Sequence, residues 1–161
     1  MELFRLTHLT SILAELAENV RAGYVNKLVQ NGHPTTENTL ASTVTAQVEV
    51  HGSTYEAVLN LQDYWKYVEE GTRPHWPPRS AILHWVIVKP VIPHPDKNGR
   101  LPSPNSLAFL ISRKIAREGT KGTHDLKETT DVLLARYEEL IAEALGLDTF
   151  EYIEKIITPT P

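Results

Sequence analysis

Apolar residues near the start of the chain recur at helical spacing. From Ile12 onward, most successive apolar positions are three, four or seven residues apart, which places them on one stripe of a helix. Asn31-Gly32, followed by Pro34, ends this pattern with residues that terminate helices. The sequence therefore predicts a helix over residues 8–31.

Two segments with alternating polarity follow this helix. Apolar residues fall at even positions over residues 43–50 and, with Val58 as the exception, at odd positions over residues 55–61. Residues 51–54 between them have the composition of a turn. Such alternation is typical of a β-hairpin with one face in water, and we predict it over residues 41–62.

Proline dominates the middle of the chain. The sequence holds 11 prolines, and eight of them lie between residues 74 and 104. Gly71-Thr72 starts this region, and the five prolines of residues 90–105 exclude a regular element there. We predict a Gly-Thr turn and a Pro-rich region over residues 71–105, which includes an exposed loop inserted at 90–105.

An apolar run lies inside this Pro-rich region. It follows Pro77-Pro78 and extends to Lys89, and prolines are common where a helix begins. We predict a buried helix here, with Trp85 as the tryptophan most suited to the core. The β-branched residues at its end, Val86 to Val88, leave a strand open as the alternative.

The last third of the chain again has helical spacing. A helix over residues 107–117, capped by Asn105 or Ser106, is expected to bury Phe109, Leu110 and Ile115. A final helix is expected to end at Leu145 with Gly146 as its C-cap. The predicted helices thus cover residues 106–146, and residues 147–161 form a tail in which residues 149–157 add a short helix or strand.

These elements predict an α+β fold in a single domain over residues 1–161. A small antiparallel sheet of three or four strands would pack against the N-terminal helix and the C-terminal helices, with the Pro-rich loop as an insertion. A chain of 161 residues suits one domain, and the absence of cysteine excludes disulfides and thiolate metal sites. No apolar run approaches the roughly 18 residues of a membrane helix, so we expect no membrane partner.

Charge is distributed unevenly along the chain. The net charge is −4, but residues 1–60 carry −3, residues 61–127 carry +5 and residues 128–161 carry −6. Two explanations stay open: the basic middle of one copy pairs with the acidic end of another, or the charges neutralise each other within one monomer.

Few residue patterns indicate catalysis. No phosphate-binding loop or nucleophile elbow is present, and no two histidines lie three to five residues apart. One alternative is a small metal- or acid/base-dependent hydrolase or nuclease that uses His75, His84 or Glu69. The more favoured expectation is a protein with no catalytic residues, no bound metal and no cofactor.

A second alternative is a nucleic-acid-binding accessory protein. The basic residues of the 107–117 helix and its end could contact phosphates. They are Arg113, Lys114, Arg117 and Lys121. Aromatic residues for base stacking are not interleaved with them, which favours a solvated or partner-facing surface.

Aromatic residues cluster just before and within the Pro-rich region. All three tryptophans lie within 22 residues of one another, together with two tyrosines. Such side chains serve both cores and interface hot spots, so we expect one or two in the core and the others at an interface.

The segment over residues 64–78 resembles a signature of small proteins from tailed bacteriophages, the tail-completion or head–tail connector proteins of the neck. The matching pattern is an aromatic residue, Val-Glu-x-Gly-Thr and a Pro-rich turn, here Tyr67, Val68 to Thr72, and Pro74 with Pro77-Pro78. A helix that ends in Glu118-Gly119-Thr120 is similar to the second block of that family. The resemblance extends over residues 8–145.

This resemblance implies a structural virion protein that forms a homo-oligomeric ring between head and tail. Its other partners would be neck, portal or tail proteins, and DNA would at most pass through the ring. The protein would be assembled in the host bacterial cytoplasm and end in the virion. The expected interface and structural residues are Trp65, Tyr67, Glu69, Gly71, Thr72, Arg73, Pro74, Trp76 and Arg79.

Overall fold

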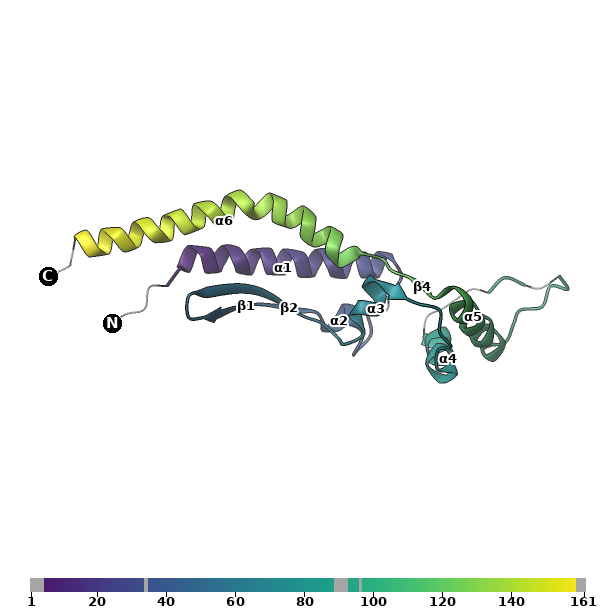
Figure 1. The fold of residues 1–161 in the computed structure, drawn as a ribbon. Coiled ribbons are helices and arrows are strands. Elements are labelled where there is room, and N and C mark those ends of the chain that lie inside the picture. Colours follow the sequence, from purple (N-terminus) through teal and green to yellow (C-terminus); the bar gives the residue numbers. More distant parts are fainter. Residues whose placement is uncertain (1–4, 34, 89–92, 96, 159–161) are drawn as a thin grey trace. The chain divides into compact units, whose positions relative to one another are not determined.

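The chain folds into two compact units, which are seen in a computed structural model that describes residues 5–33, 35–88, 93–95 and 97–158. Unit 1 comprises Met1–Asp63 and Asp125–Pro161, and unit 2 comprises Tyr64–His124. Unit 2 is thus inserted, in sequence, between two segments of unit 1 (Figure 1). That these units make one domain stays a prediction.

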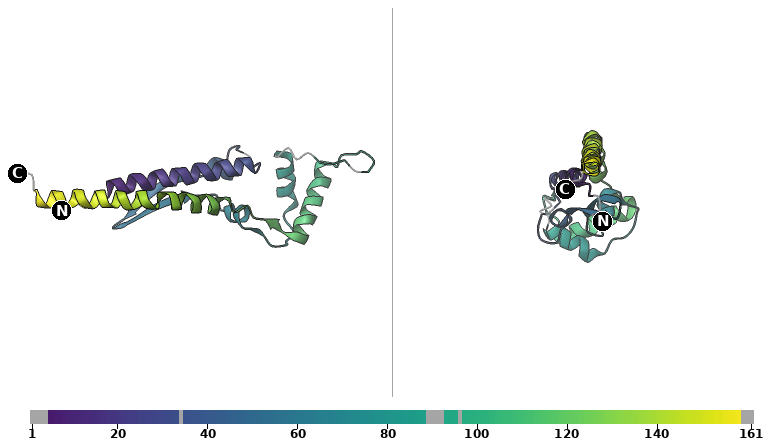
Figure 2. Two further views of the ribbon diagram at one scale, coloured as in Figure 1. Left: turned by 90° about the horizontal axis from the view of Figure 1, so that it is seen from above. Right: turned by 90° about the vertical axis from the view of Figure 1, so that its left-hand side faces the viewer.

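Unit 1 is built on two long antiparallel helices, α1 (Thr7–Gln30) and α6 (Asp125–Ile157) (Figures 1 and 2). The hairpin of β1 (Thr45–His51) and β2 (Thr54–Asn60) packs against α1. The N-terminal helix and the hairpin are both confirmed at nearly their predicted bounds.

The hairpin differs from its prediction at the first residues. Leu40–Thr43 forms a short helix, α2, in place of the start of a strand. Thr39 and Ser42 form a capping box, in which the Thr39 backbone N–H donates to Ser42 Oγ at 3.0 Å. These local hydrogen bonds satisfy the first turn and favour a helix over an extended chain.

The core of unit 1 lies where α1 and α6 face each other. Leu16, Val20 and Tyr137 form a buried cluster, against which partly buried aliphatic residues of both helices and of β2 pack. The hydroxyl of this buried tyrosine is hydrogen-bonded: it donates to Glu15 Oε1 at 2.6 Å and accepts from Asn19 Nδ2 at 2.5 Å.

Helix α6 is longer than predicted, and the expected end at Leu145 with Gly146 as C-cap is wrong. The helix continues through Gly146 to Ile157. Asp148, which is buried, accepts hydrogen bonds from the backbone N–H groups of His8 (3.0 Å) and Leu9 (2.9 Å). This contact ties the last third of α6 to the first turn of α1, and it outweighs the roughly 1 kcal/mol that a glycine costs inside a helix.

The described part of unit 2 contains three helices. They are α3 (Trp65–Glu69), α4 (Arg79–Val88) and α5 (Pro104–Glu118), and α4 packs against α5. Ser103, and not Asn105 or Ser106, caps α5: its Oγ accepts from the Ser106 N–H at 3.2 Å, and a proline follows it at the first helical position. The predicted helices of this region are therefore confirmed with an earlier start for α5, but the burial expected of α4 is wrong, since Val86 is its one buried residue.

The loop predicted over residues 90–105 lies partly outside the described residues, at 90–92 and 96. The described residues 93–95 and 97–103 form no helix or strand. Its last two predicted residues belong to α5, since proline fits the first turn of a helix.

The α+β class is confirmed, but the single sheet of three or four strands is wrong. The described residues form two separate antiparallel pairs, β1 with β2 in unit 1 and β3 (Gly71–Thr72) with β4 (Thr120–Lys121) in unit 2. Between the hairpin and Gly71 the chain forms α3, which separates the two pairs along the sequence.

Candidate interaction surface

The two sequence blocks that resemble phage neck proteins meet in unit 2. Gly71 pairs with Lys121 and Thr72 pairs with Thr120, so the strands β3 and β4 join segments almost 50 residues apart. Two further backbone bonds extend the contact, from the Thr123 N–H to the Val68 carbonyl and from His124 N–H to the Glu69 carbonyl, both at 3.1 Å. We call this arrangement, residues 68–72 with 118–124, the clasp.

Glycine is required on both sides of the clasp. Gly71 has φ +78°, and a Cβ at this position would lie 2.2 Å from the Thr120 carbonyl oxygen. Gly119 has φ +73°, and its Cβ would lie 2.0 Å from the Thr72 carbonyl oxygen. Both backbones approach too closely for any side chain, and both adopt the left-handed region that glycine tolerates best. The glycine of each Gly-Thr pair is therefore explained by the close approach of the two backbones.

The threonines of the clasp bind each other. Thr72 Oγ1 and Thr120 Oγ1 lie 2.9 Å apart, and the Thr120 backbone N–H donates to Thr72 Oγ1 at 3.2 Å. These bonds add side-chain links to a pair of strands that are each two residues long. Gly71 and Thr72, two of the predicted motif residues, thus hold together the two segments of unit 2 that form the clasp.

Other residues of the motif divide between the interior and the surface. Glu69 is buried at the end of α3, whereas Arg73, Pro74 and Arg79 are exposed. His75 Nδ1 lies 2.9 Å from the Arg73 carbonyl oxygen.

Aromatic side chains of unit 2 are mostly exposed. Tyr67 is 64% exposed and Trp76 is 58% exposed, and Trp65 is half-buried. The ring centroids of Trp76 and Phe109 are 6.1 Å apart with a 60° tilt, which links the segment before α4 to α5. The expectation that Trp85 lies in the core is wrong, since it is 40% exposed.

Helix α5 also presents an apolar surface that the sequence pattern did not predict. Phe109 (44% exposed) and Leu110 (51% exposed) do not face inward as expected. The buried positions of α5 are the small residues Ala108 and Ser112, because small side chains let α4 and α5 pack together.

The basic residues lie on this same exposed side of α5 and just after it. Arg113, Lys114, Arg117 and Lys121 are all exposed. Positions 109, 113 and 117 are four residues apart and fall on one face of the helix. Arg117 Nη2 is 3.2 Å from the adjacent Glu118 Oε1, an exposed pair of little energetic weight. One face of α5 is therefore apolar near its start and basic near its end.

The two units carry opposite charges. Unit 1 holds six basic and sixteen acidic residues, a net charge of −10, and unit 2 holds ten basic and four acidic residues, a net charge of +6. The difference in net charge between the two units is therefore larger than the difference between the sequence segments.

A group of potential metal ligands belongs to unit 1, whereas the residues of the hydrolase alternative belong to unit 2. Glu49, His51 and Glu56 place ligand atoms within 4.8 Å of one another on the hairpin. Hydrogen bonds from His51 and Gln47 lower the pKa of Glu49. None of the residues named for a hydrolase belongs to this group, and the group is exposed or half-buried.

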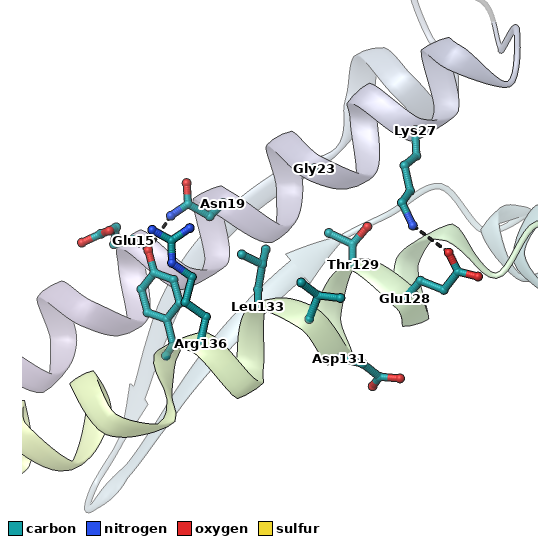
Figure 3. Close-up of a pocket in the computed structure, with 11 residues that line it drawn as sticks. Glu15, Asn19, Gly23, Lys27, Glu128, Thr129, Asp131, Leu133 and Arg136 are labelled. Carbon is teal, nitrogen blue, oxygen red and sulfur yellow. Dashed lines mark hydrogen bonds and ion pairs between the residues drawn. The ribbon is translucent and has the colours of Figure 1, made fainter.

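An open groove lies between α1 and α6 in unit 1 (Figure 3). At one end, Lys27 Nζ and Glu128 Oε2 form an ion pair at 2.9 Å, and Glu15 and Asn19 lie towards the other end. None of the site residues expected from the sequence lines this groove.

Sequence reasoning missed the exposed face of α6. Phe150 is 66% exposed and Ile157 is 71% exposed, and Ile153 lies between them at helical spacing. The spacing of three and four residues is typical of a helical stripe, but Gly146 before it favours a helix end. Among the described residues, no helix is both long and apolar enough to span a bilayer.

Comparisons of the chain with known protein families, curated proteins and solved structures found no match.

Proposed function

We propose that this protein is a structural subunit of the neck of a tailed bacteriophage, a tail-completion protein that assembles into a ring between head and tail. The observation that carries the proposal is the clasp. Both blocks of the resemblance, Val68 to Thr72 and Glu118 to Thr120, contribute to one feature whose glycines cannot be replaced without a clash. A shared local structure is a stronger basis for the resemblance than either short motif.

The distribution of charge and apolar surface supports self-assembly. A closed ring requires each copy to present two different, mutually complementary surfaces. Units with net charges of −10 and +6 supply such surfaces in one chain. Exposed aromatic residues, here Tyr67 and Trp76, are typical of binding hot spots.

The proposal includes no enzymatic activity, no metal and no cofactor. The ring would be made in the cytoplasm of the host bacterium and carried in the virion, in contact with other neck, portal or tail proteins. DNA would pass through its lumen and would not be read in sequence.

Sedimentation velocity and negative-stain electron microscopy of the purified chain, over a range of concentrations, test this function. Rings of uniform size, formed equally with and without a divalent-metal chelator, are the expected result. A chain that stays monomeric and whose coding sequence is flanked by metabolic genes, in place of portal, capsid and tail genes, would overturn the proposal. Steep salt-dependent DNA binding without assembly would instead favour a nucleic-acid-binding protein.

A further inference from the structure

The outer faces of α5 and α6 have complementary patterns. On α6, Glu139 and Glu143 precede Leu147, Phe150 and Ile157, and all five lie on one exposed face, opposite buried Tyr137 and Asp148. Along the chain this face is acidic at Glu139 and Glu143 and then mainly apolar from Leu147 to Ile157, with Glu154 among the apolar residues. The outer face of α5 is apolar and then basic.

We propose that the outer face of α6 in one copy binds antiparallel along the outer face of α5 in the next copy. In this orientation Phe109 and Leu110 contact Phe150, and Arg117 lies opposite Glu143. The apolar parts of both helices meet each other, and so do the opposite charges. A parallel arrangement would place the arginine beside the apolar end of α6 and is disfavoured. The inference rests on the proposed self-assembly and names its interface.

The spacings along the two helices agree with this register. Leu110 and Arg117 are separated by seven residues, as are Glu143 and Phe150. Seven residues of an α-helix span about 10.5 Å, so both contacts can form at once. Since the two faces belong to units of opposite net charge, long-range attraction favours the same pairing.

Gly146 supplies an independent observation. It lies on the same exposed face of α6, between Glu143 and Phe150, and a Cβ there would have no neighbour within 4 Å. Its own unit therefore gives no reason for a glycine, which is unfavourable inside a helix. In the proposed register Gly146 faces Arg113 and Lys114, and its lack of a side chain lets the second helix approach closely.

The contact is heterologous, because it joins two different surfaces of identical chains. Repetition of such a contact closes into a ring or continues as a filament. A symmetric contact between two α6 helices would instead stop at a dimer.

Engineered cysteines test the contact directly, because the natural chain contains none. Full-length Leu110→Cys protein is mixed with full-length Phe150→Cys protein under mild oxidation, and disulfide-linked dimers are resolved on a non-reducing gel. We expect at least tenfold more linked dimer in the mixture than in either protein alone. Leu145→Cys, which is exposed on another side of α6, is the matched control and should link weakly to Leu110→Cys.

Charge reversal tests the register. Arg117→Glu should weaken association about tenfold or more, because it places like charges opposite each other. Arg117→Glu combined with Glu143→Arg in the same chain should restore association, since every interface then carries the swapped pair. Circular dichroism checks that both variants stay folded.

The outcomes separate this inference from the proposed function. Rings without the mixed disulfide would overturn the α5–α6 contact and leave the ring intact. The mixed disulfide with filaments but no rings would support the contact and contradict the neck function. If Phe150→Cys protein forms linked dimers without the Leu110→Cys protein, the contact is a symmetric one between two α6 helices. If Arg117→Glu loses DNA binding while its self-association is unchanged, the basic face binds nucleic acid. Either result overturns the inference.

Discussion

Unit 1 and unit 2 differ in how far they bury their apolar side chains. Unit 1 buries a continuous core between two long helices and the hairpin, centred on Leu16, Val20 and Tyr137. Unit 2 buries little among its described apolar residues, with Val86 and Ala108 inside and many larger side chains outside. Unit 1 gains stability from packing, whereas unit 2 depends on its clasp and exposes surface suited to a partner.

This comparison makes the clasp the most sensitive part of unit 2. Gly119→Ala combines a left-handed backbone conformation with a backbone clash, and we expect it to cost at least about 3 kcal/mol. Gly99→Ala is the matched control, since Gly99 also has positive φ but open space around it, and it should cost about 1–2 kcal/mol. Hydrogen exchange should show loss of protection confined to unit 2. Equal effects of both substitutions would contradict the role of the clasp.

In unit 1 the corresponding link is Asp148, which caps α1 from α6. Asp148→Ala removes the acceptor for two buried backbone N–H groups, and we expect a loss of about 1–3 kcal/mol in the free energy of unfolding. Glu151→Gln, which weakens the exposed contact with His8 at the same end of the helices, should change it by less than about 1 kcal/mol. Chemical denaturation followed by helical circular dichroism compares the two.

Acid should weaken unit 1 through the same carboxylate. Burial acts to raise the pKa of Asp148, but the hydrogen bonds from Leu9 and His8 outweigh it and hold its pKa below the usual value. The resulting stabilisation is present above the unfolded pKa of about 3.9 and is lost as pH falls through the folded value. Asp148→Asn should therefore show a flatter decline in stability below about pH 4. An unchanged pH profile would contradict this assignment.

The smallest expected effect comes from the threonine pair of the clasp. Thr72→Val removes the hydroxyl that accepts from the Thr120 N–H, and we expect a cost of about 0.5–1.5 kcal/mol. Thr72→Ser keeps the hydroxyl and should retain most of this stability. A Val variant as stable as the Ser variant would show that the backbone pairing of β3 and β4 suffices.

Local patterns predicted the elements of unit 1 well, because each element has its own spacing of apolar residues and ends at residues that terminate helices or form turns. The helix over residues 8–31 and the hairpin needed only spacing and turn residues. The end of α6 could not be predicted in this way, since Asp148 favours continuation of the helix past Gly146 only when α1 lies beside it. Tertiary contact there outweighs the local preference of glycine.

For unit 2, the sequence predicted the elements better than their burial. Resemblance led to Gly71 and Thr72, yet nothing local indicated that the second block would pair with them, because the partner is almost 50 residues away. Phe109, Leu110 and Trp85 were expected inside because they are large and apolar. A unit with a small core leaves such residues exposed, which no single helix pattern reveals.

The clasp also sets an order for folding during synthesis. Residues 68–72 and 118–124, which complete unit 2, leave the ribosome before α6, which unit 1 requires for its core. Unit 2 can therefore close first, while α1 and the hairpin still lack their last helix. A nascent chain in which residue 124 has left the ribosome and α6 has not would hold a closed unit 2 and an incomplete unit 1, and release of α6 would be the step that completes the fold.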